Sequence, residues 1–411
     1  MLKAQARPIP LRARPFEKTH VTTPVWLKLI IGRELAPSRE EYNHVVDALW
    51  DGDFAMDRLV EWMFKYGPKQ ARELFQQALD EGLESVENCP EELSDFFKTL
   101  DSPPDWIDQS LIREGAQFIH GTGLTSAYVL RDLALMGGYL LSGFNQSLVM
   151  TGALNNGTSR RVAETGKWWM DCTEPTGLSR FGDGFKSTLH VRLIHGLVRR
   201  NLTSKTEWDH EKWGLPLSQI DMVATYLGFS VVMLGGLRKL GIPVGSRESK
   251  AVMHLWAYAC WLMGVEPKWL VQTEREGVVL LQHTFMTQSR PDWTSRELAQ
   301  ALANEPKERS YKHFASVKRW LTYHQHLSIS QYFLGTKKLE QLGLPNNITS
   351  WYAVISTPPR FVFYASCRLI PGLHKQQQIK GRKQQLATLA SMFGEMEQRV
   401  IKPDEKHPAH I

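Results

Sequence analysis

One histidine lies among aliphatic side chains in a segment with helical periodicity, residues 188–202. On a helix, His195 shares its face with aliphatic residues one turn before it, one turn after it and two turns after it. An imidazole in such a setting is a suitable axial ligand for haem iron. Arg192 and Arg199 lie three residues before and four residues after it, so they could pair with haem propionates. The aliphatic neighbours are Val191, Val198 and Leu202.

Other interpretations of this pattern stay open. The histidine could be a core residue that is hydrogen-bonded to the backbone, with the two arginines in solvent. A metal site that joins His190 to His195 is less attractive, because the two side chains, five residues apart, point to different faces of a helix.

A second segment, residues 160–169, combines a cation and a hydroxyl on one helical face. Arg161 and Thr165 are four residues apart, so they are neighbours on a helix surface. Both could hydrogen-bond a propionate or dioxygen. Glu164 lies near the same face and could act as a base. The alternative is an ordinary pair of side chains on a surface or at an interface.

The elements that position these residues are predicted to be helices. Apolar residues recur at spacings of three and four from residue 40 onward, whereas only residues 351–355 and 360–364 resemble strands. Four prolines indicate a flexible arm over residues 1–24. Because no linker-like stretch divides the middle, residues 25–380 are expected to form a single all-α domain. Residues 381–411 are expected to form a C-terminal helix and a polar tail.

Composition and charge narrow the function classes. The net charge is +6, but basic residues are dispersed among acidic ones, and the short basic clusters at residues 7–14 and 375–383 lack interleaved aromatics. This pattern argues against a nucleic-acid partner and favours a solvated face or a weak membrane-surface contact. The apolar stretches 133–154 and 223–237 are interpreted as buried core helices rather than membrane spans.

Several familiar motifs are missing from the sequence. It contains no HExxH, no P-loop and no GxSxG, and its four cysteines form no CxxC pair, which argues against a zinc site and a disulfide framework. No secretory leader is visible, so a cytoplasmic location is expected. Helical proteins without nucleotide motifs often hold a cofactor between their helices.

Together, these motifs resemble the latex clearing protein and MpaB-like oxygenase family. An Arg-x-x-x-Thr helix is followed by a loop broken by Pro and Gly at residues 173–184, and then by Val-Arg-x-x-His-x-x-Val-Arg. The sequence PPDWID at residues 103–108 is similar to the family's entry segment. The sequence WAYACWLMGV at residues 256–265 is similar to its later Trp/Tyr helix. The resemblance covers about residues 100–290.

The resemblance implies a globin-like helical core, with additional N- and C-terminal helices, that holds one haem b. In that family His195 matches the proximal iron ligand, and Arg161 and Thr165 match two distal-side residues. The implied activity is haem-dependent oxygenation of an apolar organic substrate, such as an alkene, an isoprenoid or a lipid-like molecule, by dioxygen.

Two departures from the family's pattern argue against oxidative cleavage of polyisoprene. Rubber-cleaving members have a lysine directly before the threonine and a glutamate further upstream, where this chain has Glu164 and Asn145. Two other functions also stay open: a non-catalytic haem protein, such as a sensor or carrier, and a haem-free helical interaction protein. Expected pocket walls are Leu140, Phe144, Leu148, Trp168, Trp169, Trp256 and Tyr258.

Overall fold

The computed structural model describes residues 7–152, 157–370 and 372–400, which form helices and connecting loops without any strand. This confirms the predicted all-α class. The two runs that resemble strands lie within one helix, α20 (Trp351–Leu369), whose outward side is solvent-exposed.

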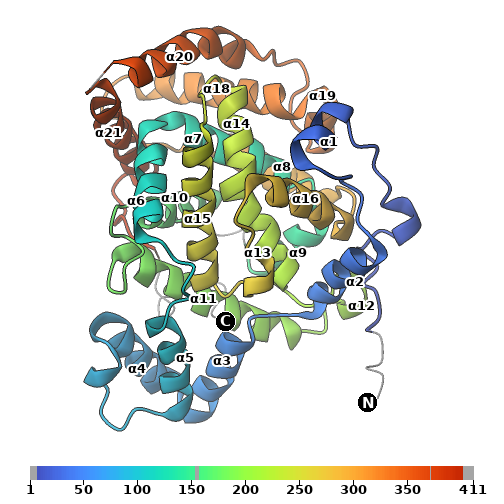
Figure 1. Cartoon of the computed structure of the whole chain (residues 1–411), viewed down its shortest axis with the longest axis vertical. Helices are drawn as coiled ribbons and strands as arrows, with labels where there is room; N and C mark the ends of the chain where they lie inside the picture. Colours follow the sequence, from blue (N-terminus) through green and yellow to red (C-terminus); the bar gives the residue numbers. More distant parts are fainter. Residues whose placement is uncertain (1–6, 153–156, 371, 401–411) are drawn as a thin grey trace.

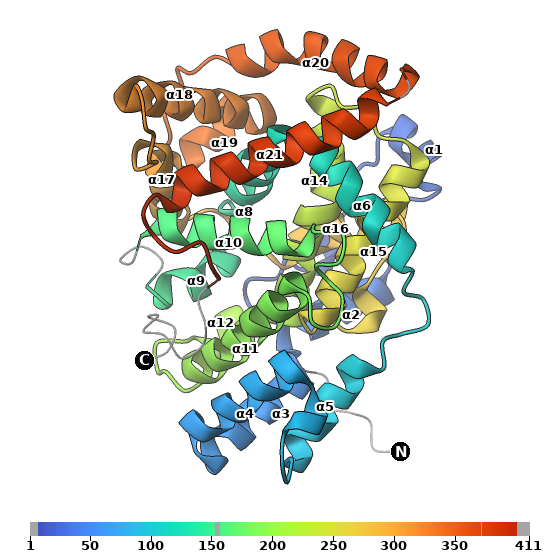
Figure 2. The same cartoon turned by 90° about the vertical axis from the view of Figure 1, so that its left-hand side faces the viewer.

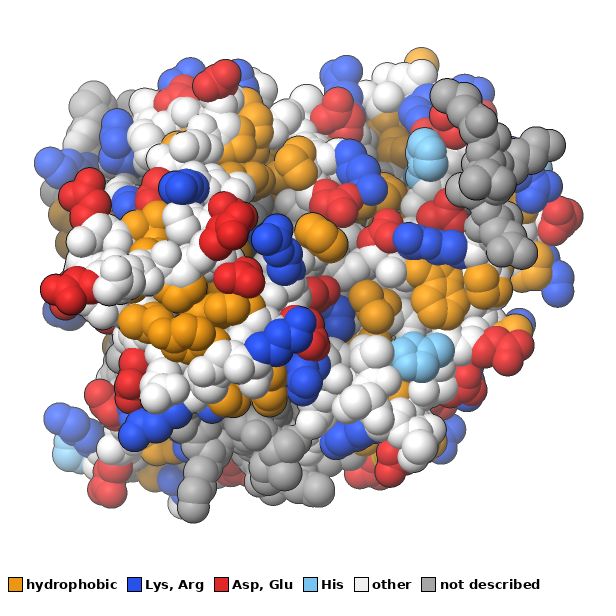
Figure 3. All heavy atoms as spheres, turned by 90° about the horizontal axis from the view of Figure 1, so that it is seen from below, with side chains coloured by type: hydrophobic (Ala, Val, Ile, Leu, Met, Phe, Trp, Pro, Cys, Tyr) orange, Lys and Arg blue, Asp and Glu red, His pale blue; other side chains and the backbone are white. Residues whose placement is uncertain are grey.

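Three groups of helices succeed one another from bottom to top in Figure 1. The lower group is α3 (Phe54–Tyr66), α4 (Pro68–Glu81) and α5 (Glu91–Asp101). The central group contains α6 (Gln109–Gly121), α10 (Thr158–Cys172), α11 (Asp183–Thr203), α13 (Gln219–Leu227), α14 (Met233–Lys239) and α15 (Ser246–Leu262). The upper part contains α18 (Ala315–Leu334) and α20, and α21 (Leu373–Phe393) descends from it. Seen from below in Figure 3, acidic and basic side chains are intermingled on the lower face.

Shorter helices complete the fold. Two of the segments between them are π-helical, Leu130–Leu135 and Gly228–Val232, a form that is often found at functional sites. The other α-helices are α1 (Val25–Ile31), α2 (Arg39–Asp47), α7 (Leu124–Val129), α8 (Met136–Gly138), α9 (Ser142–Met150), α12 (His210–Trp213), α16 (Glu274–Thr284), α17 (Trp293–Asn304) and α19 (Thr336–Gln341).

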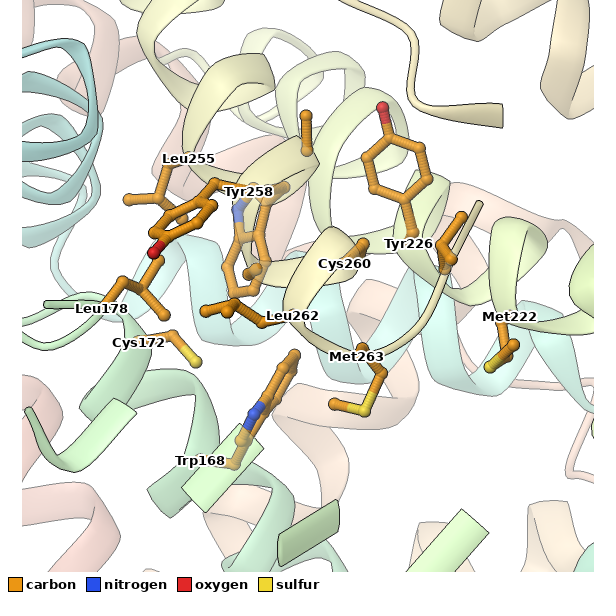
Figure 4. Packing of buried hydrophobic residues seen from close by; sticks show 14 of the residues in the cluster. Trp168, Cys172, Leu178, Met222, Tyr226, Leu255, Tyr258, Cys260, Leu262 and Met263 are labelled. Atoms are coloured by element: carbon orange, nitrogen blue, oxygen red, sulfur yellow. The ribbon is translucent and has the colours of Figure 1, made fainter. Parts of the chain in front are cut away.

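Large aromatic side chains form the centre of the core. Trp256 on α15 is fully buried and packs against Trp168 and Phe229, with ring centroids 5.6 and 4.9 Å away. Figure 4 shows Trp168 reaching from α10 toward Leu262 and Met263. Rings of this size bury much apolar area, which explains why a tryptophan-rich sequence supports a wide helical core.

The apolar stretch 223–237 lies within this core. Within the described part of the chain, Gln219–Lys239 is the one helix that is long and apolar enough to cross a membrane. However, 67% of its most apolar window is buried inside the molecule. This burial fits the expected core helix. The other stretch is divided among a π-helical segment, α8 and α9, and its last two residues lie outside the described residues.

The two ends of the described chain are attached to the body. Arg12, in the segment expected to be a flexible arm, is buried and donates to Asp221 of α13 and to the Thr287 carbonyl (2.8 Å). Helix α21 begins at Leu373 and therefore crosses the predicted boundary at residue 381. Figure 2 shows α21 running across α10 and α6, and the Gln385 amide donates to the Ile119 carbonyl of α6 (3.0 Å).

Candidate functional site

Helices α10 and α11 converge at the loop that joins them and diverge away from it (Figure 2). At the closed end, Trp168 Nε1 donates to Thr188 Oγ1 (2.9 Å). Arg161 lies seven residues before Trp168, and His195 lies seven residues after Thr188. At 1.5 Å per residue each is about 10 Å, or two turns, from this contact. The fold thus places the two predicted motifs at the same level of two facing helices.

The ring of His195 contains a buried nitrogen that no described residue satisfies. Its Nδ1 has no hydrogen-bond partner. Burial and the charge of Arg199 lower the pKa of His195 to about 4, so the imidazole is neutral at physiological pH. An unpaired buried polar atom costs about 1–3 kcal/mol. A neutral imidazole is the form that binds a metal, so the residue fits an axial ligand of haem iron.

The two arginines flanking His195 are already paired within the protein. Arg192 forms a buried bidentate pair with Asp53, with nitrogen–oxygen distances of 2.6 and 2.9 Å, and also donates to the Leu262 carbonyl (3.1 Å). Arg199 pairs with Asp57 (2.7 Å) and donates to the Leu217 carbonyl (3.0 Å). Their geometry therefore assigns them to holding α11 against α3, instead of to the propionate contacts expected from the sequence.

Arg161 differs from them. Within the described residues it forms no ion pair, although it is half-buried and burial lowers the pKa of its guanidinium. Arginines seldom enter a protein interior without a partner. Its charge acts on Tyr139, whose pKa is raised by burial against the opposing effects of Arg161 and Arg131. Arg161 is therefore available to an anionic or charge-developing ligand.

Thr165 and Glu164 occupy different environments on α10. The Thr165 side chain is exposed to a cavity, and its hydroxyl donates to the Arg161 carbonyl (2.9 Å). In this state its oxygen can accept a hydrogen bond from a ligand. Glu164 forms an ion pair with Arg160 (2.8 Å) and does not line the cavity. The structure therefore brings Thr165, but not Glu164, to the cavity.

The cavity has a volume of about 220 Å³ and a mostly apolar wall. A single water needs only about 10–15 Å³ on this scale, so an organic ligand has room to enter. Both π-helical segments contribute to the wall, which also contains Thr225 of α13. His195 does not line this cavity. Apolar wall residues include Leu135, Leu141, Phe144, Val162, Trp169 and Phe229.

Two of the expected pocket walls, Phe144 and Trp169, line the cavity. The other five are packed elsewhere: Trp168, Trp256 and Tyr258 belong to the main core, and Leu140 and Leu148 pack against a smaller core between α17 and α18. Asn145 is fully buried and donates to the Tyr139 carbonyl (2.9 Å).

A cluster of polar side chains that borders the cavity was not expected from the sequence. His326 Nδ1 lies 2.6 Å from Asp132 Oδ2, and Arg131 donates to the other oxygen of the same carboxylate (2.6 Å). Glu305 pairs with Arg131 (3.1 Å) and with Arg309 (2.7 Å). Burial alone would raise the pKa of Glu305, but the charges of Arg309 and Arg131 lower it to about 2.

Comparison with known proteins identifies the family of this chain. The family model described as "ER-bound oxygenase mpaB/B'/Rubber oxygenase, catalytic domain" matches residues 124–366, more than half of the chain. A rubber oxygenase from Streptomyces sp. (strain K30) is 23% identical over 201 residues, which are 48% of this chain and 47% of that protein. The chain thus aligns with about half the length of this curated relative.

The fold itself is similar to a solved structure, latex clearing protein in the closed state. The TM-score is 0.61 at 18% sequence identity, covering 83% of this chain and 91% of that one. Because the matched family model spans Arg161, Thr165 and His195, the resemblance seen in the sequence is confirmed. The chain belongs to the ER-bound oxygenase mpaB/B' and rubber oxygenase family.

Proposed function

We propose that this protein is a haem b-dependent oxygenase that acts with dioxygen on an apolar organic substrate. One observation carries the proposal: a neutral histidine and an arginine lie at the same level of two diverging helices, and among the described residues the histidine has an unpaired buried nitrogen and the arginine has no ion pair. Membership of an oxygenase family and the adjacent apolar cavity support it.

In this proposal His195 of α11 would hold the haem iron, on the side of α11 that faces α10. Iron would supply the redox chemistry that activates dioxygen. The Arg161 guanidinium would bind a propionate or stabilise negative charge developing on dioxygen, an interaction that is strong where water is excluded. Thr165 would orient a ligand through its hydroxyl, and the apolar wall would bind the substrate and keep water out.

The test combines a spectrum with a turnover measurement. The purified full chain, supplied with haem if necessary, should show a Soret band and should consume dioxygen when a reductant and an isoprenoid alkene are present. A Soret band with reversible oxygen binding but no turnover on any alkene or lipid would favour the carrier or sensor alternative. No haem uptake at all would contradict the proposal and favour an interaction protein.

We also propose that the face formed by α20 contacts a membrane surface. Ile355, Val362 and Leu369 recur every seven residues on its outward side and are 68, 63 and 82% exposed. The following helix α21 exposes Lys375, Lys380 and Lys383. An exposed apolar row beside basic residues suits an interface with anionic lipid. The family description that names an ER-bound oxygenase supports this.

Sedimentation with phosphatidylserine-containing vesicles tests this contact. The unmodified protein should sediment with the vesicles, and Ile355→Glu combined with Val362→Glu should abolish this. Phe54→Glu, at an exposed position on α3 at the opposite end of the molecule, is the matched control and should leave binding intact. Equal binding by all three proteins, or by none of them, would refute the proposal.

A further inference from the structure

The cavity wall contains two buried polar atoms that have no hydrogen-bond partner among the described residues, Trp169 Nε1 and His326 Nε2. The large majority of buried side-chain polar atoms in proteins have a partner, either in the protein or in ordered water, so each exception calls for an explanation. A ligand in the cavity is one source of such a partner, because both side chains border a space that can hold one. An indole nitrogen only donates, whereas a bare imidazole nitrogen only accepts.

We propose that the cavity selects an otherwise apolar substrate that carries a hydroxyl group, which donates a hydrogen bond to His326 Nε2 while Asp132 fixes the ring. The inference rests on the proposed function only in taking this cavity as the place where the substrate binds. A pure hydrocarbon would leave both polar atoms of the wall unpaired. A hydroxyl is a small group that can both donate and accept.

The pairing of His326 with Asp132 determines which ring nitrogen carries the proton. Burial and the charge of Arg131 lower the pKa of His326 to about 4, so the ring is neutral at physiological pH. An ionised carboxylate can only accept hydrogen bonds. The 2.6 Å contact therefore requires the proton on Nδ1 and leaves a lone pair on Nε2. A ligand group that meets this nitrogen must be a donor, which a hydroxyl is and an ether or a ketone is not.

The charges around this end of the cavity cancel. Arg131 and Arg309 supply two positive charges, and Asp132 and Glu305 supply two negative ones. Each charge is satisfied within the cluster, and Arg131 donates additionally to the Leu302 carbonyl (2.6 Å). The cluster therefore attracts neither a carboxylate nor an ammonium group, and the geometry favours a neutral donor.

The experiment compares three probes of equal chain length: n-hexanol, pentyl methyl ether and heptane. Their binding to the full-length protein is measured by calorimetry. The alcohol should bind roughly tenfold more tightly than the ether, because only the alcohol satisfies Nε2. Equal affinities for the alcohol and the ether in the unmodified protein would overturn the proposal without any variant being needed.

Substitutions then identify the residue that causes the preference for the alcohol. His326→Phe should remove the preference for the alcohol and leave heptane affinity within about twofold, because the ring volume is retained. His120→Phe is the matched control: His120 is also buried with an unpaired Nε2, but it does not line the cavity, so the preference should persist. Loss of the preference in the His120 variant, or its survival in the His326 variant, would refute the assignment.

Asp132→Asn provides a sharper test. Arg131 donates to Asp132 Oδ1, so the amide oxygen of the variant should stay on that side and the amide nitrogen should face His326. That nitrogen is a donor, which forces the ring proton onto Nε2, as happens when an aspartate that orients a catalytic histidine is replaced. Affinity for the ether should then equal or exceed that for the alcohol. An unchanged preference for the alcohol would refute the argument from the tautomer.

Failure of this inference can be distinguished from failure of the proposed function. The same three probes are titrated into His195→Ala, which should lack haem. If that variant retains the alcohol preference, the cavity assignment stands independently of the haem. If the unmodified protein takes up haem and oxidises alkenes but shows no alcohol preference, only the present inference fails.

Discussion

Replacing Asp53 by Ala tests whether Arg192 has a structural role. Asp53 and Arg192 are 4 and 7% exposed, and the substitution would leave the guanidinium buried, with the Leu262 carbonyl as its remaining hydrogen-bond acceptor among the described residues. Removing one member of a buried ion pair typically costs about 3–5 kcal/mol. Gly264, with a φ of 93°, closes the site, since a Cβ there would lie 2.0 Å from Asp53 Oδ2.

The assay is urea unfolding followed by circular dichroism, with a matched control on the same two helices. Glu61 pairs with Arg200 at 2.8 Å, again between α3 and α11, but the two side chains are 54 and 39% exposed. Glu61→Ala should cost at most about 1 kcal/mol. Adding Arg192→Met to Asp53→Ala should recover part of the loss, because it removes the unpaired cation.

If Asp53→Ala costs no more than Glu61→Ala, the pair does not hold α11 against α3. If, in addition, Arg192→Met loses haem while keeping the stability of the unmodified protein, the arginine contacts a propionate as the sequence suggested.

Further predictions concern Arg161 and His326. Arg161→Met should lower the oxygen-consumption rate by roughly 10²–10³-fold while the Soret band stays, since a preorganised charge is lost; an unchanged rate would remove Arg161 from the mechanism. The free energy of unfolding should decrease as pH falls from 6.5 to about 4, because unfolded His326 binds a proton in this window and folded His326 does not. At about 1.4 kcal/mol per pKa unit this contribution is about 3 kcal/mol, and it should be missing from urea titrations of His326→Gln. The same slope in both proteins would contradict the burial argument.

The spacing of residues along the chain was enough to predict that the two motifs lie on consecutive helices, α10 and α11, joined by one loop. Arg161, Thr165 and His195 lie on helices that are adjacent in sequence, so helical periodicity and one connecting loop determine how they face each other. The all-α class followed from the same periodicity. The strand-like runs within α20 were ambiguous because an exposed helix with an apolar outer row and two internal prolines has no ordinary helical pattern.

Long-range pairing could not be predicted in this way. The acid that neutralises Arg192 lies 139 residues earlier, and the histidine that meets Asp132 lies 194 residues later. No local spacing encodes such contacts, so Arg192 and Arg199 were assigned to propionates and the His326 cluster was not expected. The boundary expected at residue 381 was wrong because α21 already begins at Leu373. This helix is held by long-range hydrogen bonds of its buried glutamines rather than by a strong apolar stripe, so its pattern in the sequence is weak.

The most direct test of the central claim is the absorption spectrum of His195→Ala beside that of the unmodified protein and of His190→Ala. His190 lies on the same helix but faces Gln76 of α4 (2.9 Å). We expect a Soret band in the unmodified protein and in the His190 variant, and its loss in the His195 variant with helicity preserved. An unchanged Soret band in the His195 variant would show that another residue binds the iron.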